Sequence, residues 1–234
     1  MIAIFKRELR SYLTSPVGYS YLFIFALVTG FVFWSNNIIG STTDTLNYFA
    51  WTRYLLIITI PLLAMKLFPE ERKNKTDQIL ITAPVSITGM VMGKFLAAYA
   101  MFLIGLIPTV VNMLFLASVG YLEYGIVIGN YIGLLFIAAA FLAIAMLMSV
   151  LTESMITAFV MGAFTLAFFA VADYISSSLN NTVITKIVSA ISVTERYSEF
   201  NQGLFNISSL IYFLSLAVIF IFLTVRVIDK RRWS

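Results

Sequence analysis

The sequence contains no cysteine and no histidine among its 234 residues. Disulfides, thiolate or imidazole metal sites, cysteine or serine–histidine nucleophile systems and histidine proton switches are therefore excluded at the level of residue type. Charged residues are also scarce, at 11% against about a quarter in ordinary soluble domains. Few catalytic chemistries remain, so we expect no enzymatic activity in this chain and keep an intramembrane enzyme only as a remote alternative.

Hydrophobic residues make up 61% of the chain, and the mean hydropathy is +0.96. A spanning helix needs roughly 20 mostly apolar residues, and six segments qualify: 19–35, 51–68, 91–120, 125–151, 154–172 and 207–227. The sequence thus predicts an all-α, polytopic membrane protein with six transmembrane helices in one domain, residues 1–234. The third and fourth segments are long enough to tilt or to protrude from the bilayer.

The basic residues are distributed unevenly between the two sides of these spans. Three of the 15 lysines and arginines fall on one side, namely Arg53, Lys186 and Arg196, and the other twelve fall on the opposite side. The positive-inside tendency then predicts that both termini and the 66–94 loop are cytoplasmic. No small-residue cleavage site follows the first apolar segment, so we expect it to be retained and not removed as a signal peptide.

Residues 1–15 have the pattern of an interfacial helix that lies in the headgroup region. Apolar side chains recur at helical spacing, while basic ones face elsewhere; the residues that define this helix are Phe5, Lys6, Arg7 and Arg10, with Ile2, Leu9 and Leu13 on its apolar face. Ser15 and Pro16 suit a cap and a first helical residue, so the chain is predicted to turn there into the membrane. An ordinary basic juxtamembrane anchor is the alternative.

A polar segment, residues 69–86, interrupts the apolar runs. Asn74 and Asp77 stand three apart as in a capping box, and Pro84 disfavours helical geometry at the residue before it. We expect a short helix of about two turns between them, whose apolar residues 79–81 dock on the chain's own bundle or in a groove of a partner. A solvated charged loop is the alternative interpretation.

Two further patterns concern glycines. Gly125, Gly129 and Gly133 form two small-xxx-small steps, which permit close helix packing either within one chain or across a dimer. Residues 89–95 superficially resemble a phosphate loop, but the segment is one residue short, lacks the Ser or Thr after its lysine and follows no predicted strand. We therefore expect no nucleotide binding by this chain.

Ionisable residues are almost absent from the span centres, where each costs about 2.5–3.5 kcal/mol on insertion scales. Those in or near the spans lie close to the ends, where snorkelling suffices: Arg53, Lys66, Glu153, Asp173 and Arg226. This placement argues against a proton-coupled transporter or an ion channel. Before the last span, apolar residues 184, 187, 188 and 191 share one helical face, which predicts an amphipathic element on the outer surface.

The polar segment and its surroundings resemble the cytoplasmic signature of ABC-2-type permeases. The resemblance rests on Phe68-Pro69-Glu70-Glu71-Arg72, Thr76, Ile79-Leu80-Ile81-Thr82-Ala83-Pro84-Val85-Ser86 and Gly93-Lys94. It extends over essentially the whole chain and is strongest to the gliding-motility-associated permeases of Bacteroidota, whose external motif before the last span is similar to Tyr197, Phe200 and Gly203 here. Lys75 and Gln78 depart from the family, which usually has glycine and glutamate at these positions.

The resemblance implies a permease subunit that couples ATP hydrolysis by a separate ABC ATPase to export or to mechanical work. Residues 69–86 would be the coupling segment, and those expected to contact the ATPase are Glu70, Glu71, Arg72, Lys73, Thr76, Asp77, Ile79, Leu80, Ile81, Thr82 and Pro84. Residues 173–206 would form an external gate-like hairpin.

For partners, the resemblance implies that ATP and Mg²⁺ bind the ATPase, that this chain binds no cofactor, metal or nucleic acid, and that a second permease chain, identical or paralogous, completes a dimer. The resemblance is also compatible with an additional periplasmic or membrane auxiliary subunit. The setting would be the lipid bilayer of a bacterial cytoplasmic (inner) membrane. A non-transporting scaffold or anchor of an ABC-driven motility or secretion machine is the alternative with the same architecture.

Overall fold

The structure is a computed structural model that describes residues 1–74, 86–178, 192–204 and 206–232. All regular structure in these residues is helical. The elements, in chain order, are α1 (Ile2–Thr14), α2 (Pro16–Phe33), the π-helix η1 (Trp34–Ile39), α3 (Leu46–Ala64), α4 (Pro69–Lys73), α6 (Ile87–Val119), α7 (Tyr124–Leu151), α8 (Met155–Ser178), α10 (Val193–Asn201) and α11 (Ile207–Arg232).

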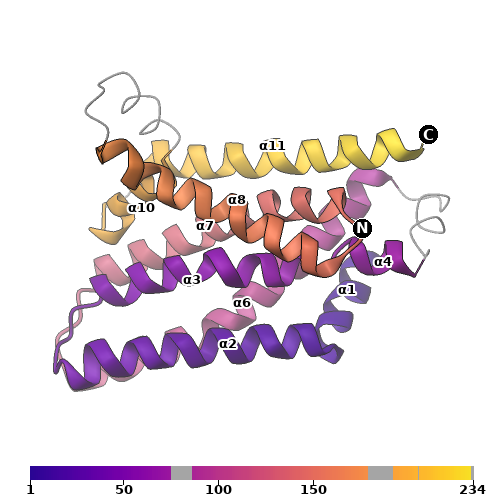
Figure 1. The fold of residues 1–234 in the computed structure, drawn as a ribbon. Helices are drawn as coiled ribbons and strands as arrows, with labels where there is room; N and C mark the ends of the chain where they lie inside the picture. The colour runs from indigo at the N-terminus through magenta and orange to yellow at the C-terminus, as the bar shows by residue number, and fades with distance from the viewer. Residues whose placement is uncertain (75–85, 179–191, 205, 233–234) are drawn as a thin grey trace.

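The long helices form a bundle with α7 near its centre (Figure 1). In the most apolar stretch of α7, 67% of the residues are buried inside the chain, against 22% for the stretches on α2 and α11. Figure 1 shows α2 and α11 at opposite edges of the bundle, with both chain termini, α1 and α4 gathered at one end and α10 at the other. The edge helices therefore present most of their apolar side chains outward.

Five stretches in the described residues are long and apolar enough to cross a membrane: Pro16–Ile39, Leu46–Lys73, Ile87–Val119, Tyr124–Leu151 and Ile207–Lys230. The prediction of a multi-pass helical membrane protein is thus confirmed at this level. The apolar described part of α8, Met155–Ala170, is shorter. The sixth predicted span, residues 154–172, therefore stays a prediction.

The connection between the first two spans is shorter than the sequence indicated. A loop was expected over residues 36–50, but η1 extends the first spanning helix to Ile39 and α3 already begins at Leu46. The apolar residues Ile38 and Ile39 continue the helix past its predicted end at residue 35. Asn37 closes the turn by donating from Nδ2 to the carbonyls of Thr42 and Asp44.

Serine caps begin two of the long helices. Ser15 Oγ accepts the Gly18 amide at 3.4 Å, and Pro16 stands at the first helical position, so the predicted cap and first residue of α2 are confirmed. Ser86 likewise accepts the Gly89 amide at 3.2 Å at the start of α6. Residues 89–95, the segment with a superficial phosphate-loop pattern, therefore belong to a continuous α-helix.

Candidate functional site

The first helix buries a different face from the one its apolar pattern suggested. Ile4, Glu8 and Tyr12, one turn apart, are the buried residues of α1, whereas Ile2 is 67% exposed. This face packs closely along α6 at Gly93, where an added Cβ would lie 3.0 Å from the Met1 carbonyl oxygen. The helix therefore has an exposed face and a buried face, and the buried one carries a carboxylate toward the bundle.

Lys94 is the centre of a buried polar network at this end of the bundle. Its side chain is fully buried in α6. Its Nζ donates to the Leu67 carbonyl at 2.6 Å and lies 2.9 Å from Glu71 Oε2 and 3.4 Å from Glu8 Oε1. It also stands 5.3 Å from the centre of the Phe68 ring. One ammonium group thus joins α1, α4 and α6, and it is shielded from water.

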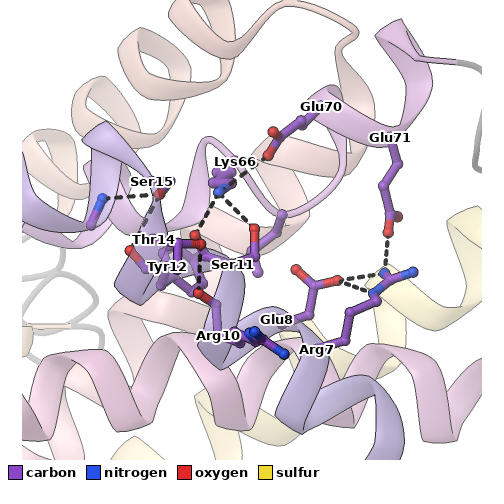
Figure 2. A network of polar contacts seen from close by, with 12 residues as sticks. Arg7, Glu8, Arg10, Ser11, Tyr12, Thr14, Ser15, Lys66, Glu70 and Glu71 are labelled. Carbon is purple, nitrogen blue, oxygen red and sulfur yellow. Dashed lines mark hydrogen bonds and ion pairs between the residues drawn. The ribbon is translucent and has the colours of Figure 1, made fainter.

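Arg7 contacts the same network from its more exposed side. Its guanidinium contacts both Glu8 and Glu71, as Figure 2 shows, so the two carboxylates share two cations. Burial acts to lower the pKa of Arg7, but hydrogen bonding and charge from Glu8, followed by Glu71, outweigh it and raise the pKa above its ordinary value. The pairing therefore holds Arg7 in its charged form.

Lys66 forms a second link between α1 and the start of α4. Its Nζ donates to the Ser11 carbonyl at 3.1 Å and to Ser11 Oγ at 2.8 Å, and Glu70 lies 3.6 Å away (Figure 2). Tyr12 donates to the Leu63 carbonyl at 2.6 Å. Burial, and then the charges of Glu8 and Glu70, raise the pKa of this phenol well above its ordinary value, so it remains a donor.

The two residues Glu71 and Arg72, adjacent on α4, reach different parts of the bundle. Glu71 belongs to the buried network with Lys94, and its side chain is only 15% exposed. Arg72 instead contacts Glu153, in the turn between α7 and α8, at 2.7 Å, and the Glu153 side chain is 72% exposed. The short helix α4 is therefore held firmly on the α1–α6 side and weakly on the α7–α8 side, because exposed ion pairs contribute little.

At the opposite end of the bundle, the predicted glycine stripe meets the predicted external motif. A Cβ added to Gly129 would lie 2.9 Å from the Phe200 carbonyl oxygen, and one added to Gly133 would lie 2.9 Å from the Tyr197 ring. Nothing lies within 4 Å of such an atom at Gly125. In this chain, the contacts of Gly129 and Gly133 are made by α10.

The end of α10 explains why a glycine stands in that motif. Gly203 has φ +73°. Its amide donates to the Phe200 backbone carbonyl, and the Leu204 amide donates to the Glu199 backbone carbonyl. These two bonds form a Schellman-type cap. Tyr197 and Phe200 are buried, and the Tyr197 hydroxyl donates to Asn130 Oδ1 at 3.0 Å. The external motif thus fixes α10 into the bundle through packing and one buried hydrogen bond.

Two of the cations expected to snorkel lie inside the bundle instead. Arg53, 8% exposed, is held between the rings of Tyr54 and Tyr197, with centroid distances of 4.5 and 5.2 Å. Lys66 is 6% exposed and bound to Ser11. Local carbonyls and aromatic faces stabilise these charges, so they have no need to extend to the membrane surface.

The remaining predicted site residues have varied surroundings. Lys6, Arg10 and Lys73 are exposed, and Phe5 is half-buried. Asn74 ends α4, with its amide bonded to the Glu70 carbonyl. The predicted coupling residues Thr76, Asp77, Ile79, Leu80, Ile81, Thr82 and Pro84 lie outside the described residues, as do residues 184, 187, 188 and 191.

Sequence reasoning gave no site role to the two residues at the centre of the network: Glu8 was not singled out, and Lys94 was named only as part of the family resemblance. Glu8 is a single acid in a basic helix, at the spacing of Ile4 and Tyr12, and Lys94 is a single charge about two turns inside an apolar helix. Each of these isolated charges could have been recognised in the sequence as unusual for its helix. Comparison with known proteins adds no assignment: no protein-family model matches the chain, and no curated protein matches it either.

Proposed function

We propose that this chain is the membrane-spanning permease subunit of an ABC-2-type assembly, driven by ATP hydrolysis in a separate ATPase subunit. The observation that best supports the proposal is the attachment of α4 at the base of residues 69–86. Glu71 joins this helix to α1 and α6, and Arg72 joins it to the α7–α8 turn. A force applied to the polar segment would therefore act on several helices at once.

The proposal includes six membrane crossings with both termini in the cytoplasm. Both chain ends lie at the same end of the bundle (Figure 1), which is consistent with an even number of crossings. Among the described residues, five helices qualify by length and composition, and α8, which packs along α7 and α3, supplies the sixth. The excess of lysine and arginine at the end that carries α1 and α4 favours the cytoplasm for that end.

In the proposed mechanism, the strong and weak attachments of α4 have different roles. The buried pairs with Lys94 keep α4, α1 and α6 together as one unit. The exposed pair between Arg72 and Glu153 is the contact that opens when this unit moves relative to α7 and α8. ATP drives the change only if the ATPase binds one arrangement more tightly, since equal affinity for both states shifts nothing.

The proposed coupling segment is tested by replacing Leu80 and Ile81 together with aspartate. We expect an ATPase with a P-loop sequence to co-purify with the wild-type chain and to be retained at least tenfold less by this variant, because the charged side chains cannot enter an apolar groove. The measurement is quantitative mass spectrometry of the purified membrane complex, combined with its ATP turnover.

A matched control places the same pair of charges at the other end of the bundle, by replacing Ile38 and Ile39, which are 49% and 61% exposed. This variant should retain the ATPase. Equal retention and turnover in both variants would show that the polar segment does not bind the ATPase. Substrate passage and mechanical work are then separated by transport measurements in sealed vesicles that contain the assembly.

A further inference from the structure

An apolar groove lies between the start of α6 and the end of α11. Its volume is about 470 Å³. Val218, Ile221, Phe222 and Val225 of α11 form one side, Thr88 and Met92 of α6 form the other, and Arg226 and Asp229 stand at its polar end. The groove is at the end of the bundle that carries α1 and α4, but it shares no residue with the polar network.

The lining residues of α11 form a continuous stripe on an outward face. Val218, Phe222 and Val225 recur at spacings of four and three residues, and Val218 and Phe222 are 64% and 53% exposed. At 1.5 Å per residue, the stripe extends about 16 Å from Val218 to Asp229. Because α11 is one of the helices able to cross a membrane, its apolar part would be immersed in hydrocarbon.

Arg226 is positioned at the boundary between the apolar and polar parts of the groove. Its guanidinium carbon lies 5.0 Å from the centre of the Phe222 ring, so the side chain folds back over the groove. Within the described residues, Arg226 forms no ion pair. The sequence beyond it adds three basic residues and one acid, Asp229, so this end of α11 is net positive.

We propose that the groove binds one anionic phospholipid, with an acyl chain along the α11 stripe and the phosphate at Arg226. The apolar lining matches the acyl chain, and the end of α11 is net positive because four basic residues, Arg226 among them, outnumber Asp229. Basic clusters next to a transmembrane helix attract anionic headgroups. A groove open to the membrane is occupied by lipid unless another protein covers it. The inference depends on membrane insertion and not on the proposed transport function.

The test uses the full chain in neutral detergent micelles, with phosphatidylglycerol or phosphatidylcholine of identical acyl chains added. Native mass spectrometry counts the lipids bound per chain. We expect the wild type to bind phosphatidylglycerol about fivefold more tightly, which corresponds to about 1 kcal/mol for one basic residue near an anionic lipid. Arg226→Ala should abolish this preference, whereas Lys6→Ala, at an exposed position on α1, should preserve it.

A second pair of variants tests the acyl chain. Val225→Trp fills the groove and should lower the binding of both lipids, whereas Leu214→Trp places the same indole on α11 outside the groove and should not. The proposal is wrong if the wild type shows no preference or if Arg226→Ala retains it. It is also wrong if Arg226→Ala and Val225→Trp convert a dimer to a monomer without changing lipid binding, because a second copy of the chain would then be the occupant.

Discussion

Replacing Lys94 with methionine is expected to lower the free energy of unfolding by about 3 kcal/mol, because two largely buried carboxylates then lose their shared cation. Removal of one partner from a buried ion pair typically costs about 3–5 kcal/mol. We expect the lower end of this range, since Arg7 still contacts both Glu8 and Glu71. Reversible unfolding in detergent, followed by tryptophan fluorescence, measures the effect.

Two controls separate the lost charge from a lost contact. Lys73→Met removes an exposed lysine from α4 and should change stability by less than about 0.5 kcal/mol. A triple variant that adds Glu8→Gln and Glu71→Gln to Lys94→Met should recover most of the loss, because no carboxylate is left buried without its cation. The network is not the source of stability if Lys94→Met unfolds like the wild type, or if the triple variant is no more stable than the single one.

The same series bears on the proposed function. If Lys94 holds α4 to α1 and α6, its loss should reduce the movement that the polar segment, residues 69–86, transmits to these helices. This reduction is expected even in protein that remains folded. Glu153→Gln removes only the exposed partner of Arg72 and should change stability by less than about 1 kcal/mol. Comparison of the two variants distinguishes a contact that holds the site together from one that is made and broken.

Local features of this chain could be predicted from the sequence, and contacts between distant residues could not. The start of α2 depends only on the neighbouring residues Ser15 and Pro16, so its cap could be predicted from the sequence. The burial of Glu8 depends on Lys94, 86 residues later. The apolar spacing in α1 is compatible with either face being buried. Partners far along the chain decide between the two faces, and Lys94 is one of them.

The external motif illustrates the same limit. The spacing of Gly129 and Gly133 predicted a close approach by another helix, and Tyr197 and Phe200 were identified separately from a resemblance. That these two sets contact each other follows from the way α10 returns onto α7, which involves pairing over more than 60 residues. The expectation that Arg53 would snorkel failed for a related reason, because the rings that stabilise it include one from α10.

The second large effect on stability is expected in the glycine stripe, when Gly125, Gly129 and Gly133 are each replaced by alanine. Gly129→Ala should destabilise the protein by about 1–3 kcal/mol, because its Cβ would lie 2.9 Å from the Phe200 carbonyl oxygen and 3.2 Å from Gly203 Cα, both backbone atoms. Gly133→Ala should cost a similar amount, since its added Cβ would lie 2.9 Å from the Tyr197 ring and 3.0 Å from Phe200 Cβ, and both side chains are buried. Unfolding in detergent gives the three values under identical conditions.

Gly125→Ala is the matched control, because nothing lies within 4 Å of its added Cβ and alanine favours a helix over glycine by up to about 1 kcal/mol. It should therefore be neutral or slightly stabilising. The order of effects also decides between the two roles that the glycine spacing left open. Packing within one chain predicts that Gly129 and Gly133 are both more sensitive than Gly125. A stripe that packs across a dimer would instead make the exposed Gly125 the most sensitive position, and its substitution would lower the oligomeric mass measured by light scattering.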